Sequence, residues 1–236
     1  MSYERKVEFE VQQWKTKLLR KSSVFERVSK RVQNKINEKI PEKIHVVVTE
    51  SIKKMVEATL HGSNLTTFKK DTSNLSLEEK DKLVFETLKK YQKAAAIEGA
   101  GTGAGGFALS LADFPLLLGI KMKFLFEAAS IYGFNTKKIE ERVFLLHLFQ
   151  LAFSSEEKRP LLLEKIEAWD QMNENNIDWR VFQQDYRDFI DLVKLFQLLP
   201  GIGAVVGGVA NYKLLDHLGE YAMNGFRLRI IKDGNE

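Results

Sequence analysis

The sequence predicts an all-α protein built as a single helical domain. Apolar residues recur every three or four positions over most of the chain, which is the period of a helix with one buried face. No Asn-Gly turn lies between two alternating apolar runs, so the usual signature of a β-hairpin is missing. Only four prolines interrupt the 236 residues, a length that suits one large domain or two closely packed halves.

The first 62 residues read as a basic helical arm. Its first apolar stripe consists of Val7, Val11, Trp14 and Leu18, and the same spacing continues from residue 25 to residue 40. Pro41 ends that pattern, and a second helix follows, which Gly62 is placed to cap. Helical spacing favours helix over strand even at Val46–Val48. We therefore predict an arm over 1–62 and a core over 63–236, with one domain over 1–236 as the alternative.

Capping signatures place the helices of the core. Ser76 with Glu79 three residues later forms a capping box, and a buried stripe runs from Leu77 to Tyr91. Ser154 with Glu157 forms a second box, opening a helix that carries Pro160 in its first turns. Asp178 is the expected N-cap of a further helix, ended by Pro200 and Gly201.

Composition excludes several classes of protein. The absence of cysteine rules out a disulfide scaffold and thiolate metal sites, and fits a reducing compartment. The N-terminus has no apolar stretch of the kind that directs secretion, so we expect a cytoplasmic protein. The four histidines are scattered without ligand spacing. We predict no metal and no cofactor.

Two glycine-rich segments, 94–133 and 198–218, are the most unusual feature. A shift of 102 residues superposes Gly101 on Gly203, Gly105 on Gly207 and Gly106 on Gly208. We interpret them as two helical hairpins that form a weak pseudo-repeat and pack together, because glycine allows close approach of backbones. Neither segment has the strand and Lys-Ser/Thr context of a phosphate-binding loop. Each is too short or too interrupted to span a bilayer alone, although shallow insertion stays open.

The order of motifs around these glycines resembles the EcsC family. The motifs are Ala112-Asp113-Phe114-Pro115, Ile131-Tyr132-Gly133, Pro200 to Gly208, Ala210-Asn211-Tyr212 and Asp216-His217-Leu218-Gly219, and the likeness runs from Ala94 to Arg229. The family is named for a gene cluster that also encodes the ATPase and membrane subunits of an ABC transporter linked to protein secretion. The resemblance thus implies transporter subunits as partners and a place at the cytoplasmic membrane face. It carries no catalytic residues.

Three residues are candidates for chemistry. Asp113 lies among apolar residues, where burial would raise its pKa, yet it is also placed to cap the helix that starts near Pro115. Asp216 beside His217 could orient the imidazole, with Asn211 about one and a half turns away. The capping and packing interpretation is favoured for all of them.

The basic bias is confined to the N-terminus. Residues 1–39 hold eleven Lys and Arg against five Glu, while the whole chain has a net charge of +4. The first interpretation of this charge is a solvated helix face that needs no partner. The second is a membrane-surface helix, which would use Lys17, Arg20, Lys21, Arg27, Lys30 and Arg31. No nucleic-acid motif accompanies the charge, so no nucleic-acid partner is expected.

The resemblance implies an accessory or regulatory protein of an ABC transporter linked to protein secretion, and the absence of a recognisable catalytic motif favours a non-enzymatic role. Two alternatives stay open. One is a hydrolase that uses Asp113, Asp216 and His217, and the other is a protein whose glycine hairpins insert in the membrane.

Overall fold

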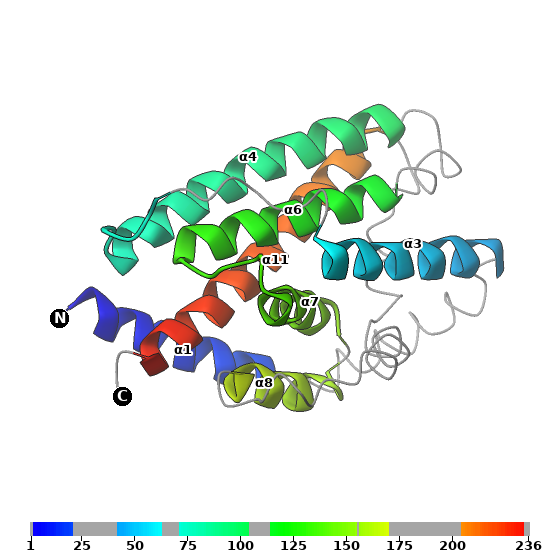
Figure 1. Ribbon diagram of the computed structural model, residues 1–236. Helices are drawn as coiled ribbons and strands as arrows, with labels where there is room; N and C mark the ends of the chain where they lie inside the picture. The colour runs from blue at the N-terminus through cyan, green and yellow to red at the C-terminus, as the bar shows by residue number, and fades with distance from the viewer. Residues whose placement is uncertain are drawn as a thin grey trace.

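The computed structural model describes residues 2–20, 42–62, 71–103, 114–154, 156–169 and 204–233. Seven α-helices lie in these ranges, and no residue within them forms a β-strand. The described part of the chain is therefore all-α, as the sequence predicts. The helices are α1 (Tyr3–Leu19), α3 (Glu42–His61), α4 (Leu77–Gly103), α6 (Phe114–Tyr132), α7 (Ile139–Phe153), α8 (Arg159–Glu167) and α11 (Ala204–Asp233) (Figure 1).

The core is built around α7. Every residue from Val143 to Phe153 is buried, and α7 contacts α3, α6, α8 and α11. Helices α4, α6 and α11 pack against one another, and α1 contacts α4, α8 and α11 (Figure 1). Sequence analysis assigns no helix to 139–153, because a segment that is apolar on every side shows no stripe.

The stripe predicted for the first helix is confirmed. Val7, Val11, Trp14 and Leu18 are the buried residues of α1, and they belong to the same core cluster as Phe226. The Trp14 ring meets the Tyr221 ring edge to face, with their centroids 5.6 Å apart. Since α1 and α3 both contribute to this core, the described helices share one hydrophobic interior. A division of the chain at residue 62 stays a prediction.

Local capping signals place two helix ends correctly. The Ser76 backbone N–H donates to Glu79 Oε2 at 2.8 Å, and the Glu79 N–H donates to Ser76 Oγ at 3.3 Å. Gly62 follows α3 with φ at +67°, a backbone conformation that glycine adopts without strain. Residues 46–48 lie in α3, so helix rather than strand is correct there.

The second predicted capping box is wrong. Ser154 ends α7 instead of opening a helix, because its Oγ donates to the Leu151 carbonyl at 3.1 Å. Helix α8 begins at Arg159 and carries Pro160 in its first turn, where proline's missing N–H leaves no hydrogen bond unmade. The helix expected to carry Pro160 in its first turns is thus present, but it begins five residues beyond Ser154.

Helices α4 and α11 run antiparallel and share the most extensive contact of any described pair. Arg227 bonds to Asp81 near the start of α4, and Asp216 bonds to Gln92 farther along it. This register brings the last turns of α4, which contain Gly101, to the same end as the first turns of α11, which contain Gly207 and Gly208 (Figure 1).

Helix α6 is also antiparallel to α4, since its last residue, Tyr132, bonds to Asp81 while Glu127 bonds to Tyr91. It therefore starts at the glycine end, at Phe114 as the sequence suggests. The predicted hairpin turns, Gly105, Gly106, Gly203 and the helix after Asp178 lie outside the described residues.

Candidate functional site

A buried carboxylate, Asp81, joins four helices. Three side chains donate to it: Tyr3 Oη of α1 at 2.7 Å, Tyr132 Oη of α6 at 2.5 Å, and Arg227 of α11 through Nε at 3.0 Å and Nη2 at 2.8 Å. Arg227 Nη1 also reaches Glu10 Oε2 of α1 at 3.2 Å. We call these five residues the Asp81 cluster.

The tyrosines of the Asp81 cluster are held in their neutral, donating form. Burial, followed by the charge and hydrogen bond of Asp81, raises the pKa of Tyr132 well above its usual value. The same causes raise the pKa of Tyr3 to about 12. Burial disfavours the charge on Arg227, but its hydrogen bonds and ion pair with Asp81 outweigh burial and raise the pKa of the guanidinium. The two tyrosines and Arg227 therefore keep the protons that they donate to Asp81.

The centre of the Asp81 cluster is closed to solvent. Asp81 is 3% exposed and Tyr132 4% exposed. Four donor bonds occupy the carboxylate, which leaves it no access to a substrate. The hydrogen bonds of the Asp81 cluster therefore fix the angles between α1, α4, α6 and α11.

An open groove of about 760 Å³ lies on the other side of Arg227. Helices α1 and α11 form its walls, and Phe9, Trp14, Arg20 and Asn224 are among the lining residues. Its charges are largely paired, since Lys17 reaches Glu220 at 3.4 Å and Arg227 bonds to Glu10. The groove is a surface feature without a converging set of free charges.

The predicted residue Asp216 takes part in the contact between α4 and α11. Its Oδ1 accepts from Gln92 Nε2 at 2.9 Å, and one turn earlier Tyr212 Oη accepts from Lys89 Nζ at 3.0 Å. The hydrogen bond to Tyr212 is the main cause that raises the pKa of Lys89. These side chains tie the two helices together close to the glycine end.

Asn211 is 1% exposed, and neither Oδ1 nor Nδ2 has a hydrogen-bond partner in the part of the chain that the structure describes. A buried amide left unpaired costs about 1 to 3 kcal/mol. Asn211 is thus a buried polar residue of α11, four and three positions after Gly207 and Gly208.

His217 faces away from Asp216. Its Nε2 lies 2.8 Å from the Ala152 carbonyl of α7, and its ring packs on Tyr221 with the centroids 4.5 Å apart. Consecutive residues on a helix point about 100° apart, so a carboxylate and an imidazole at i and i+1 reach different neighbours. Asp113, the third candidate for chemistry, lies outside the described residues.

The predicted basic surface is described only at its beginning. Lys17 and Arg20 are exposed at the end of α1, whereas Lys21, Arg27, Lys30 and Arg31 lie outside the described residues. None of the described helices has the length and apolar character that a transmembrane span requires.

His147 is a buried histidine of α7. Burial lowers the pKa of its imidazole to about 4, and Nδ1 lies 2.9 Å from Gln150 Oε1. The described ranges contain no group of three or more His, Cys, Asp and Glu side chains arranged to hold a metal ion. The ring is therefore a neutral member of the core, in contact with Trp169.

Sequence analysis missed the Asp81 cluster, although a signal was present. Asp81 lies between Leu77 and Val84 at the spacing of the buried face of α4, so it is a charge on an apolar stripe. A carboxylate at such a position needs a buried partner. Helical periodicity could flag Asp81, but it could not identify Tyr3, Tyr132 or Arg227.

Comparisons with known proteins agree over nearly the whole chain. A family model described as the EcsC protein family matches residues 5–231. Protein EcsC of Bacillus subtilis (strain 168) is 65% identical over 224 residues, which cover 95% of this chain and 94% of that protein. Uncharacterized protein YdbA of the same strain is 34% identical over 149 residues, 61% of this chain and 55% of that protein. No solved structure matches the chain.

Proposed function

The chain belongs to the EcsC family, and on that premise we propose that it is a non-enzymatic accessory or regulatory protein of an ABC transporter linked to protein secretion. It acts from the cytoplasmic face of the membrane, as a peripheral protein that contacts the transporter subunits. The transporter context comes from the family resemblance, and the structure supports the non-enzymatic part.

One observation supports the non-enzymatic part: the buried carboxylate Asp81 holds helices together. Its four donor bonds come from α1, α6 and α11, and it is 3% exposed. Asp216 and His217 likewise bond to α4 and α7 and not to each other. Charged and polar groups that bond one helix to another produce a rigid scaffold, which suits a protein that acts by binding partners at its surface.

The proposal is tested by affinity purification of the tagged protein from gently solubilised membranes. The informative variant replaces Gly207 and Gly208, both in the first turns of α11, with leucine. The matched control is Ser73→Leu/Asn74→Leu, which adds two leucines at exposed, uncharged positions just before α4, at the opposite end of that helix from Gly101. Circular dichroism and thermal unfolding identify which variants remain folded.

We expect the transporter subunits to co-purify with the wild type and with the Ser73→Leu/Asn74→Leu control. Loss of the subunits in a folded Gly207→Leu/Gly208→Leu variant would assign the contact to the start of α11. Recovery of the wild-type protein alone, at detergent levels that keep the transporter intact, would overturn the proposal. A screen for hydrolase activity would then be the next step.

A further inference from the structure

Within the described residues, one group of helix ends is almost free of charge. Three helices meet there: the last ten residues of α4 (94–103), the first seven of α6 (114–120) and the first nine of α11 (204–212). We call these three segments the tip. Glu98 is the one charged residue in their sequences, in a chain of which 29% is charged. So low a share of charged residues is unusual for helix ends, and where apolar side chains on them are exposed it indicates contact with an apolar phase or partner.

The tip exposes large apolar side chains. Ile97 on α4 is 75% exposed and Leu116 on α6 is 53% exposed. Pro115 beside Leu116 is exposed as well, and a side chain added at Gly119 would find open space. These residues contribute nothing to the core. Their exposure therefore indicates a contact with another molecule.

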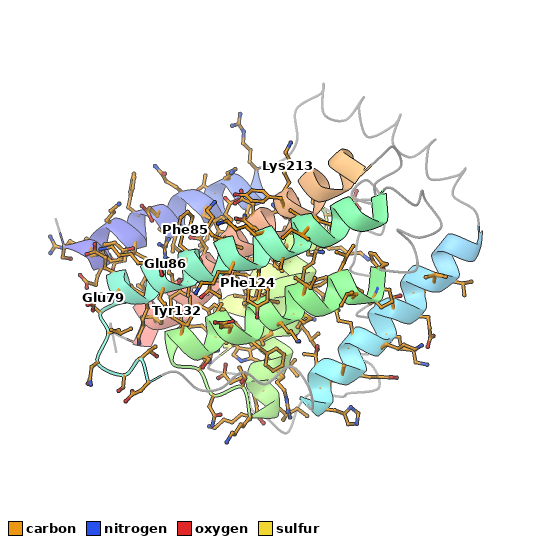
Figure 2. The ribbon with its side chains drawn as sticks, turned by 90° about the horizontal axis from the view of Figure 1, so that it is seen from above. Glu79, Phe85, Glu86, Phe124, Tyr132 and Lys213 are labelled. Atoms are coloured by element: carbon orange, nitrogen blue, oxygen red, sulfur yellow. The ribbon has the colours of Figure 1, made fainter. Side chains whose placement is uncertain are left out.

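Behind the tip stands a set of exposed lysines from the same three helices. The lysine collar consists of Lys90 and Lys93 of α4, Lys123 of α6 and Lys213 of α11. The bond between Lys89 and Tyr212 places the α4 and α11 members at one level, and the antiparallel register of α4 and α6 brings Lys123 to it. Lys213 lies toward the end at which α11 begins, away from Glu79 and Tyr132 (Figure 2).

The spacing of the two features matches a lipid interface. On α4, Lys90 and Ile97 are seven residues apart and share one exposed face, and on α6, Leu116 and Lys123 repeat that arrangement. Seven residues of helix rise about 10 Å. The polar headgroup layer on each side of a bilayer is about 5 to 8 Å thick. A protein standing on its tip would thus place the lysine ammonium groups at the lipid phosphates while Ile97 and Leu116 reach the acyl boundary.

We propose that the tip is a docking surface for an anionic lipid bilayer. Ile97 and Leu116 dip into the interface, and the lysine collar binds the phosphodiester headgroups around them. The inference rests on the membrane-face part of the proposed function and specifies which surface makes that contact. A bilayer fits better than a transmembrane helix of another protein, because lysines from three helices at one level match a plane of phosphates.

The lipid contact is tested with the purified full chain and vesicles that contain no other protein. Co-sedimentation is measured with phosphatidylcholine vesicles and with vesicles of equal parts phosphatidylcholine and phosphatidylglycerol. Each lysine near such a surface strengthens binding about fivefold. We therefore expect Lys90→Gln/Lys93→Gln to bind the anionic vesicles roughly 25-fold more weakly. The matched control, Lys137→Gln/Lys138→Gln, removes two exposed lysines beyond the other end of α6 and should bind within about twofold of the wild type.

A second readout reports which residues enter the interface. Because the chain contains no cysteine, Ile97→Cys and Leu161→Cys can each carry a single environment-sensitive fluorophore. Leu161 is 47% exposed on α8 and serves as the control position. Anionic vesicles should shift the emission to the blue at residue 97 and leave it unchanged at residue 161.

The outcomes separate the two proposals. Equal binding to both kinds of vesicle, equal losses in the two lysine pairs, or a blue shift at residue 161 alone would overturn the tip as an anionic-lipid surface. Failure to bind vesicles, together with retention on membranes that contain the transporter, would overturn the lipid contact and leave the accessory role standing. Vesicle binding as expected, without co-purification of the transporter, would overturn the accessory role and leave the lipid contact standing.

Discussion

Replacing Asp81 with asparagine tests whether the Asp81 cluster holds the four helices together. The amide keeps the shape of the carboxylate but offers one acceptor oxygen and turns an NH₂ toward groups that are themselves donors. Tyr3, Tyr132 and Arg227 all donate to Asp81 in the wild type. The substitution therefore leaves unpaired donors and a buried guanidinium with less compensation.

The expected loss follows from that geometry. Removing one partner of a buried ion pair costs about 3 to 5 kcal/mol. Arg227 keeps its bond to Glu10 at 3.2 Å, and Glu10 is partly exposed, so we place the loss of unfolding free energy for Asp81→Asn at about 3 to 4 kcal/mol. Arg227→Met should cost a similar amount, because it leaves Asp81 with the two tyrosines alone.

Urea unfolding followed by circular dichroism at pH 7 measures these losses. The double variant Asp81→Asn/Arg227→Met should be destabilised by much less than the sum of the two single variants, with a coupling energy of at least about 2 kcal/mol. An Asp81→Asn variant within about 1 kcal/mol of the wild type, or single losses that add within about 0.5 kcal/mol, would refute the assignment of Asp81 and Arg227 as a coupled pair.

Three further predictions concern the helices around this cluster. A Cβ at Gly225 of α11 would overlap the buried Leu148 Cδ2, so Gly225→Ala should cost about 1 to 3 kcal/mol, whereas Gly119→Ala, in open space, should stabilise by about 0.5 to 1 kcal/mol; equal unfolding free energies for the two variants would contradict this. Ser76→Ala should cost about 1 kcal/mol through loss of the α4 cap, and an unchanged urea midpoint would count against that role. His147 stays neutral in the folded protein down to about pH 4, whereas in the unfolded chain it is protonated below its ordinary pKa of 6.5. The neutral ring therefore does not reduce the unfolding free energy above pH 6.5, and about 3 kcal/mol of that free energy is lost as the pH falls toward 4. His147→Gln should flatten the loss of stability between pH 6.5 and 4, and an identical slope in the two proteins would contradict that assignment.

Local patterns of the sequence predict those features that local physics controls. The stripe of α1 is right because a helix with one buried face repeats its apolar residues, and the cap at Ser76 is right because its hydrogen bonds span three residues. Ser154 shows the limit of such signatures. The same hydroxyl that could accept from an N–H of a following helix donates here to a carbonyl of the helix before it, and the sequence does not distinguish the two ends.

Contacts between distant segments were beyond reach of the sequence. The donors to Asp81 lie 78, 51 and 146 residues away along the chain, and no spacing rule connects them. The interpretation of Asp216 as an orienting group for His217 rested on adjacency, although neighbours on a helix diverge. On the helix that the sequence predicts there, adjacent side chains diverge, and in the structure Asp216 bonds to α4 while His217 bonds to α7.

The two ends of the α4 and α11 pair have different roles: the end with the Asp81 cluster stabilises the fold, and the tip makes the proposed lipid contact. Asp81 and Ile97 are sixteen residues apart on one helix, which corresponds to about 24 Å. Substitutions more than about 10 Å apart with no shared partners act independently. Asp81→Asn should therefore lower the unfolding free energy without changing the vesicle affinity of the folded fraction. Lys90→Gln/Lys93→Gln should lower the vesicle affinity without changing the unfolding free energy. If folded Asp81→Asn protein bound anionic vesicles tenfold more weakly, the tip would depend on the angle that the Asp81 cluster sets between the helices, and the two ends would form one functional unit.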